Sequence, residues 1–323
     1  MMMEQTMQEM AQTFHPELAD LSRGGWLARL EDLAEEAGYF EPVGPRHSAV
    51  FIDDGPTLLV TFENVDDIRR RSAAAEPLGF ELVRTAGWSH LCILADGRTW
   101  YRDDTVYRYM DRLVDEGFFE DFDQVVFYGE GMGGYGATAF SVVAPGATVI
   151  ALRPQATLDP RITGWDNRFM AHRRLSFRDR YGYGPDMIDA AERAFILYDP
   201  HVRIDAMHAA LFNRPNVSLI RCPHMGGDLE VELRRMQVLY RILSRAGKGT
   251  LTDGAIHLLL RARRHHMPYM RSLLAHVEDL KRPYLSALLC RAMLKTKHLP
   301  KVRNRLDELQ KEGVPVPAPE AVG

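Results

Sequence analysis

The most specific residue pattern in the chain is QVVFYGEGMGGYGATAF, residues 124–140, where a strand pattern runs through a glycine-rich turn into a helix of small residues. In one interpretation, Gly129, Gly131 and Gly134 form a dinucleotide-binding turn, whose glycines let a pyrophosphate approach the backbone at a helix N-terminus. Arg153, at the end of the next expected strand, would then suit a 2′-phosphate. This interpretation predicts an NADP-binding oxidoreductase.

The same turn also fits a nucleophile elbow, G-x-S-x-G, in which Gly129 and Gly133 allow a sharp strand-to-helix turn and position 131 carries the nucleophile. Position 131 is glycine here rather than serine. The turn follows the fourth recognisable strand, whereas a dinucleotide-binding turn normally follows the first strand of its sheet. Asp199 and His224 then follow later strands, which is the chain order nucleophile, acid, histidine. Both features favour the elbow.

In the Gly-Met-Gly-Gly-Tyr of residues 131–135, the chain resembles the α/β-hydrolase superfamily, many members of which have Ser-Met-Gly-Gly-Tyr there. The resemblance covers residues 48–244. It implies a mostly parallel sheet with the elbow at its carboxyl edge. It also implies that Gly131 stands at the nucleophile position, Asp199 at the acid and His224 at the base.

The resemblance further implies an oxyanion hole made by the backbone N–H of Met132 and one from Glu63-Asn64. Without a serine hydroxyl, however, position 131 cannot form an acyl-enzyme. The helix N-terminus remains and can still hold a carboxylate, phosphate or sulfate. We therefore expect a non-catalytic or altered hydrolase-like protein, without cofactor, that binds a small anionic or acyl-bearing ligand. Its expected binding residues are Gly129, Glu130, Gly131, Met132, Gly133, Glu63 and Asn64.

The residues leave residual catalysis open. A carboxylate such as Glu130, or a water activated by His224 with Asp199, could act in place of the missing serine, because a His-Asp pair is a general base. Hydrolase activity is therefore uncertain from the sequence.

Short β-branched and aromatic runs alternate with helical stretches, which indicates an α/β fold with a mostly parallel sheet flanked by helices. A DGP turn predicts that the first two strands form an antiparallel hairpin. The expected strands are 48–53, 57–62, 89–95, 124–129, 148–153, 194–199 and 217–222. The expected helices are 104–116, 133–144, 203–213 and 227–244.

We predict four parts along the chain: an N-terminal helical segment at 1–39, a hydrolase-like domain at 40–244, a helical module at 245–311 and a disordered Pro-rich tail at 312–323. Within the domain, the long insertion 154–192 is typical of a lid over a site. In the helical module, prolines placed for first helical turns predict an antiparallel helical array. These prolines are Pro268, Pro283 and Pro300.

The net charge of −4 conceals an uneven distribution. Residues 245–311 hold 15 Lys and Arg against 5 Asp and Glu, a charge of +10, so the rest of the chain carries −14. This favours a second function class, an interaction protein whose basic module docks an acidic partner. Few aromatic residues accompany the basic cluster, which disfavours nucleic-acid binding. The cluster comprises Arg261, Arg263, Arg264, His265 and His266.

The remaining patterns exclude several classes. Cys92, Cys222 and Cys290 are too few and too widely spaced for a disulfide framework or a cysteine metal site, so we expect them in the core. Asp205 and His208 could form a metal pair but lack a third ligand, so no metal site is predicted. No apolar run reaches the roughly 18 residues of a membrane span. The first twenty residues lack the features of a secretory signal, so a cytoplasmic location is expected.

The chain also resembles a bacterial group often labelled phosphoadenosine phosphosulfate reductase. That label implies a reactive cysteine in a Glu-Cys-Gly-x-His context and a loop for the sulfonucleotide. Cys290 instead lies in LLCRAML, and the Gly-Lys pair lies in AGKGT without the rest of such a loop. The residues therefore do not support reductase chemistry.

Overall fold

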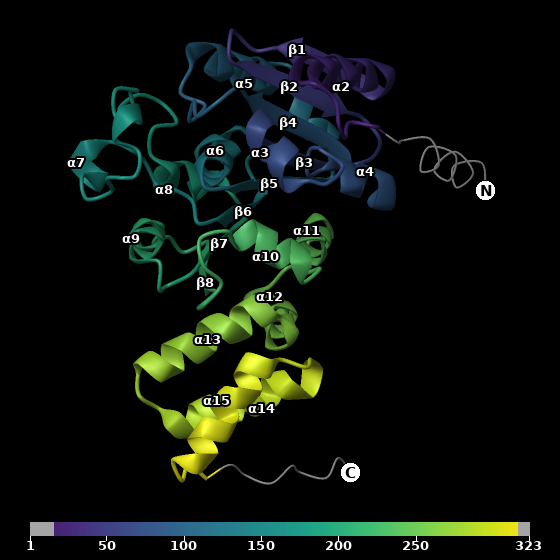
Figure 1. Cartoon of the computed structure of the whole chain (residues 1–323). Coiled ribbons are helices and arrows are strands. Elements are labelled where there is room, and N and C mark those ends of the chain that lie inside the picture. Colours follow the sequence, from purple (N-terminus) through teal and green to yellow (C-terminus); the bar gives the residue numbers. More distant parts are fainter. Residues whose placement is uncertain (1–15, 316–323) are drawn as a thin grey trace.

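The computed structural model describes residues 16–315, and within them eight strands form one sheet in the order β1-β2-β4-β3-β5-β6-β7-β8 (Figure 1). β2 runs antiparallel to both of its neighbours, whereas the strands from β4 through β8 are parallel. The predicted fold class is confirmed. The strands are β1 (Gly38–Pro42), β2 (His47–Ile52), β3 (Thr57–Asn64), β4 (Ser89–Ala95), β5 (Gln124–Glu130), β6 (Thr148–Leu152), β7 (Arg193–Tyr198) and β8 (Val217–Arg221).

The expected hairpin between residues 48–53 and 57–62 is wrong. β2 pairs with β1 and β4, while β3 lies between β4 and β5. The DGP turn only reverses the chain. β3 is buried along nearly its whole length and on both faces, so it belongs in the middle of the sheet rather than beside an edge hairpin. The edge strand β1, with its polar residues and Pro42, was not recognised from the sequence.

Helices cover both faces of the sheet. One face packs against α5 (Asp104–Asp115), α6 (Met132–Phe140) and α9 (Arg203–Leu211). On the other face, α2 (Arg23–Ala37), α3 (Val65–Arg71) and α4 (Phe80–Ala86) lie mainly over β2 and β4, and α10 (Leu229–Arg235), α11 (Leu239–Gly247) and α12 (Asp253–Leu259) lie over β5 to β8. The single helix expected at 227–244 is therefore wrong. It is split into α10 and α11 by Gln237, whose φ is +57°.

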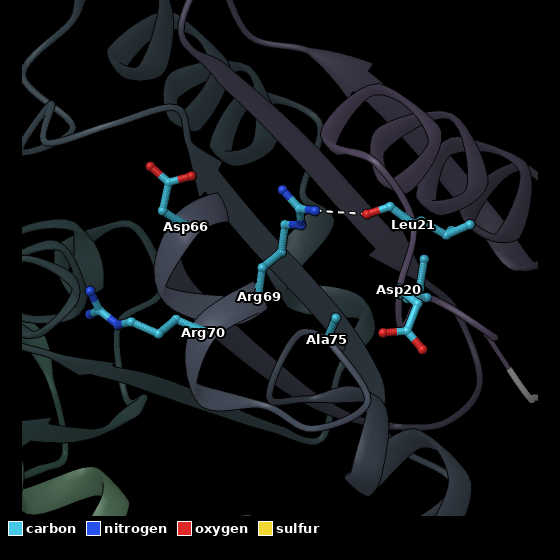
Figure 2. Close-up of a pocket in the computed structure, with 7 residues that line it drawn as sticks. Asp20, Leu21, Asp66, Arg69, Arg70 and Ala75 are labelled. Atoms are coloured by element: carbon cyan, nitrogen blue, oxygen red, sulfur yellow. Dashed lines mark hydrogen bonds between the residues drawn. The ribbon is translucent and has the colours of Figure 1, made fainter.

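The chain before α2 lies against α3 (Figure 2). The guanidinium of Arg69 on α3 donates to the carbonyl oxygen of Leu21 over 2.7 Å. The indole N–H of Trp26 on α2 donates to the carbonyl oxygen of Ala75 over 2.7 Å. These bonds hold α2 to the segment that follows β3. Residues 1–15 of the predicted N-terminal helical segment lie outside the described residues.

The last helices are α13 (Met267–Asp279), α14 (Pro283–Thr296) and α15 (Pro300–Lys311), and they lie at the end of the molecule farthest from β1 (Figure 1). Each predicted proline does lie in the first turn of its helix. α14 packs against both α13 and α15, so the chain forms a small helical array. Docking of an acidic partner by residues 245–311 stays a prediction. Residues 316–323 of the expected disordered tail lie outside the described residues.

All three cysteines are buried and unpaired, as the sequence predicts. No described helix combines the length and the apolar character needed to cross a membrane.

Candidate functional site

A single residue, Gly131, connects β5 to α6. Its backbone adopts φ +57° and ψ −115°, a region that favours glycine and allows the sharp strand-to-helix turn. Its N–H donates to the carbonyl oxygen of Leu152 on β6 over 2.9 Å, and its carbonyl oxygen accepts from the N–H of Tyr135 over 2.9 Å. As at any helix start, the N–H groups of the first turn of α6 lack acceptors within the helix.

Steric contacts distinguish the glycines of this turn. A Cβ on Gly129 would lie 2.1 Å from the carbonyl oxygen of Gly133, and a Cβ on Gly133 would lie 2.1 Å from that of Phe62. A Cβ on Gly131 would meet no heavy atom nearer than Gln155 Oε1, at 4.0 Å. The backbone therefore requires glycine at 129 and 133 but has room for a side chain at 131. This is the steric pattern of a nucleophile elbow.

The dinucleotide interpretation fits this geometry less well. Its fold has the strand order 3-2-1-4-5-6 with the glycine turn after the first strand, whereas the turn here follows β5 in a different order. Arg153, which would have met a 2′-phosphate, donates through Nε to Glu130 Oε1 over 3.0 Å.

A cavity of about 800 Å³, which we call the elbow cavity, lies over this turn. The insertion at 154–192 contributes Gln155, Arg168, Phe169 and His172 to its wall, so part of the predicted lid borders the site. All seven residues predicted to bind ligand also line it: Glu63, Asn64, Gly129, Glu130, Gly131, Met132 and Gly133.

Three side chains in the wall of the elbow cavity carry buried polar atoms without a hydrogen-bond partner among the described residues. These atoms are Trp100 Nε1, Gln155 Oε1 and His172 Nδ1. Trp100 and Gln155 are at most 1% exposed. Because the great majority of buried polar groups in proteins are hydrogen-bonded, these three atoms leave unmet hydrogen bonds in the wall of the elbow cavity. None of the three was recognised from the sequence, since the wall joins distant segments.

The Glu130 carboxylate, a candidate replacement nucleophile, is held by three donors. Arg71 approaches it at 2.5 Å and Arg153 at 3.0 Å, and the Glu230 N–H donates over 3.1 Å. Its side chain is 3% exposed. A carboxylate so enclosed and so fully hydrogen-bonded is a structural anion rather than an available nucleophile.

Two other acids in the wall have altered ionisation. Burial, followed by the charge of Glu130, raises the pKa of Glu230 to about 7, and Glu230 also accepts a hydrogen bond from the Tyr128 hydroxyl over 2.9 Å. Burial likewise raises the pKa of Glu63 above its usual range. Protonation of Glu230 near neutral pH leaves the arginines in the wall less compensated by carboxylates. The wall arginines are Arg70, Arg71, Arg98, Arg153, Arg168 and Arg234.

The side chain of Asn64 serves the fold. Its Oδ1 accepts from the N–H groups of Asp66 and Asp67 over 3.0 and 3.3 Å, which caps α3, and its Nδ2 donates to the carbonyl oxygen of Gly97 over 2.7 Å. The carboxylate of Glu63 accepts from the Leu78 N–H over 3.1 Å. Their backbone N–H groups stay the predicted oxyanion donors.

Asp199 and His224 follow the adjacent strands β7 and β8, but neither lines the elbow cavity. The carboxylate of Asp199 accepts from the N–H and the Nδ1 of His201 over 2.9 and 3.1 Å, and from the Gly226 N–H over 2.8 Å. The ring of His224 stacks on that of His201, with centroids 4.2 Å apart, and lies 4.8 Å from that of His276. The expected acid and base are thus engaged with other partners.

The insertion is anchored to α9 by a buried network. His208 accepts from the Ala156 N–H at Nδ1 over 3.2 Å and donates from Nε2 to Asp166 over 2.9 Å. Arg168 donates to Asp166 over 2.9 Å and to Asp205 over 2.6 Å. The two residues considered as a metal pair, Asp205 and His208, are therefore bound to the insertion.

Neither a protein-family model nor a curated protein sequence matches the chain. Similar solved structures include the capsule O-acetyltransferase of Neisseria meningitidis serogroup A, with 16% identity and a TM-score of 0.40 over 61% of this chain and 91% of that one. MPT51 (FbpC1) of Mycobacterium tuberculosis has 14% identity and a TM-score of 0.42 over 68% and 100%. Est1E from Butyrivibrio proteoclasticus has 14% identity and a TM-score of 0.40 over 65% and 98%. The chain has an α/β-hydrolase-like fold, as its own features show: the strand order of the sheet, the antiparallel β2, and the sharp turn from β5 into α6.

Proposed function

We propose that this protein is a non-catalytic α/β-hydrolase-like protein that binds a small anionic or acyl-bearing ligand in the elbow cavity. The observation that carries the proposal is the presence of unpaired, buried polar atoms beside an intact elbow that lacks a nucleophile. Trp100 and Gln155 supply these atoms, and Gln155 Oε1 is the heavy atom nearest to where a side chain at position 131 would stand.

These groups define the chemistry of the ligand. The first-turn N–H groups of α6 and the indole N–H of Trp100 are donors, so they favour a carboxylate, a phosphate or an acyl oxygen. Gln155 Oε1 is an acceptor, so it favours a hydroxyl or amide N–H on the same ligand. A small hydroxycarboxylate has both features.

Catalysis is not part of the proposal, for three separate reasons. Position 131 has no hydroxyl, the Glu130 carboxylate is held by two arginines, and His224 lies outside the cavity wall. Each of these removes a component that acyl transfer needs.

The proposal is tested by calorimetric titration of the full chain with acetate, lactate and inorganic phosphate. We expect saturable one-to-one binding, with lactate bound more tightly than acetate because its hydroxyl can donate to Gln155. Trp100→Phe and Gln155→Met each remove one polar group while keeping an apolar side chain of similar shape. Each should weaken lactate binding about tenfold, the effect of one lost hydrogen bond.

Trp165→Phe is the matched control. Trp165 lies in the insertion, as Gln155 does, but it does not line the cavity. It should leave the affinity unchanged. Absence of binding by all three probes, or equal binding by the two cavity variants and the wild type, would refute the proposal.

A further inference from the structure

Three histidines from separate elements converge beside the carboxyl ends of β7 and β8. His201 follows β7, His224 follows β8, and His276 lies on α13 of the C-terminal helical array. One ring nitrogen from each lies within 4.8 Å of the corresponding nitrogens of the other two. The ring centroids of His201 and His276 are 5.2 Å apart. His201 and His276 are 75 positions apart in the chain, so only the fold brings them together.

A buried carboxylate orients His201. Asp199 is 3% exposed and its Oδ1 lies 3.1 Å from His201 Nδ1. When Nδ1 donates to Asp199, the Nε2 of His201 is left as the nitrogen with a free lone pair. A carboxylate that accepts from one ring nitrogen while the other binds a metal is the usual second shell of a metal-ligating histidine. The other oxygen of Asp199 accepts from Gly226, two residues after His224, so one side chain positions both loops.

We propose that His201, His224 and His276 bind a divalent transition metal of the Zn²⁺ type, with Asp199 as the positioning residue. Three imidazoles suit Zn²⁺, Co²⁺ and Ni²⁺ and leave a fourth coordination position for water or an anion. Because one ligand comes from α13, the metal also ties the C-terminal helical array to the sheet.

The rings must move a little to coordinate a metal. Nitrogens around a tetrahedral ion at about 2.1 Å lie roughly 3.4 Å apart, so nitrogens up to 4.8 Å apart must draw together. The His201 side chain is 45% exposed and neither His224 nor His276 is fully buried, so the rings can turn without displacing core residues. The stacked pair of His201 and His224 opens in this process.

The test uses the full chain, stripped of metal with a chelator and titrated with Zn²⁺ against a chromogenic competitor. We expect one equivalent to bind. His201→Ala, His224→Ala and His276→Ala should each weaken binding by more than about 100-fold, because even outer-shell partners of metal ligands are worth roughly 10- to 100-fold. His257→Ala, which removes an exposed histidine on α12, is the matched control and should bind as the wild type does.

Two further readouts separate a built site from histidines that bind metal loosely. Co²⁺ should give the intense visible absorption of a four-coordinate ion in the wild type, and His276→Ala should lose it. Zn²⁺ should raise the melting temperature of the wild type and of His257→Ala but not that of His276→Ala, since only a site in the folded state transfers its binding energy to stability. Asp199→Asn should weaken Zn²⁺ binding about tenfold or more while keeping the Co²⁺ spectrum.

Failure of the wild type to bind Zn²⁺ stoichiometrically would overturn the proposal. So would binding by His276→Ala that equals the wild type, because the site would then not include α13. Loss of binding in His257→Ala as large as in the three cluster variants would show adventitious coordination and equally refute it.

Discussion

Replacing Gly133 with alanine is expected to destabilise the protein by about 3 kcal/mol or more, enough to prevent folding in a marginally stable chain. The new Cβ would lie 2.1 Å from the backbone carbonyl oxygen of Phe62. Phe62 belongs to β3, which is hydrogen-bonded to strands on both sides, so its backbone cannot move away without disrupting the centre of the sheet. Urea unfolding monitored by circular dichroism measures the free energy of unfolding.

Gly131→Ala is the matched control in the same turn. Its Cβ would have 4.0 Å of space, and the cost is confined to placing a non-glycine residue at φ +57° and ψ −115°, roughly 1–3 kcal/mol. The packing of the elbow thus predicts that Gly133→Ala is much less stable than Gly131→Ala. Equal stability of the two variants would show that α6 does not approach β3 as described.

The second large effect is expected at Asp166, whose side chain is 1% exposed between His208 and Arg168. Asp166→Ala should cost about 3 kcal/mol or more, because it leaves the buried Nε2–H of His208 without an acceptor and removes one of the two carboxylates paired with Arg168. Asp166→Asn, which can still accept from His208 Nε2–H, should cost less. Faster amide hydrogen exchange in residues 156–168 should accompany Asp166→Ala, since this network anchors the insertion to α9.

The same site gives a pH dependence of known sign. Although burial alone would raise the pKa of Asp166, hydrogen bonds from His208 and Arg168 hold that pKa well below its usual range. A depressed pKa in the folded state contributes stability that is present above the unfolded pKa of about 4 and is lost as the pH falls below it. The stability gap between the wild type and Asp166→Asn should therefore narrow on acidification below about pH 4. A gap that stays constant down to pH 2 would contradict the described network.

The sequence predicted the strand-turn-helix unit of residues 124–140 well because most of its determinants are local. Gly129 is required by its contacts with Gly133 and Gly134 within one strand-turn-helix unit. Gly133 is required by the approach of Phe62 on β3, but the spacing of the two glycines is visible in the chain. Most strands were likewise recognisable as buried apolar runs. Strand pairing was not, because the DGP turn reports a change of direction and β4 enters between β2 and β3 from later in the chain.

The candidate site was predicted only in part, because the sequence does not show in which direction a side chain points. The positions of Asp199 and His224 at the ends of β7 and β8 agree with the predicted chain order. Their contacts could not be predicted from the sequence. The Asp199 carboxylate accepts a hydrogen bond from His201, and the ring of His224 packs against that of His276. Whether Trp100 Nε1 has a hydrogen-bond partner depends on how the insertion packs beside it, and no local sequence pattern predicts that packing.

We propose that the elbow binds ligand but has lost acyl transfer, both at its nucleophile and at its base. The most direct test is stopped-flow hydrolysis of a short-chain p-nitrophenyl ester by the wild type and by Gly131→Ser, a variant whose new side chain has room. We expect neither to show a burst or turnover above buffer, because His224 lies with His201 and His276 rather than at the elbow cavity. Turnover by the wild type in the usual enzymatic range of about 1–1000 s⁻¹, or a one-equivalent burst with Gly131→Ser, would contradict it.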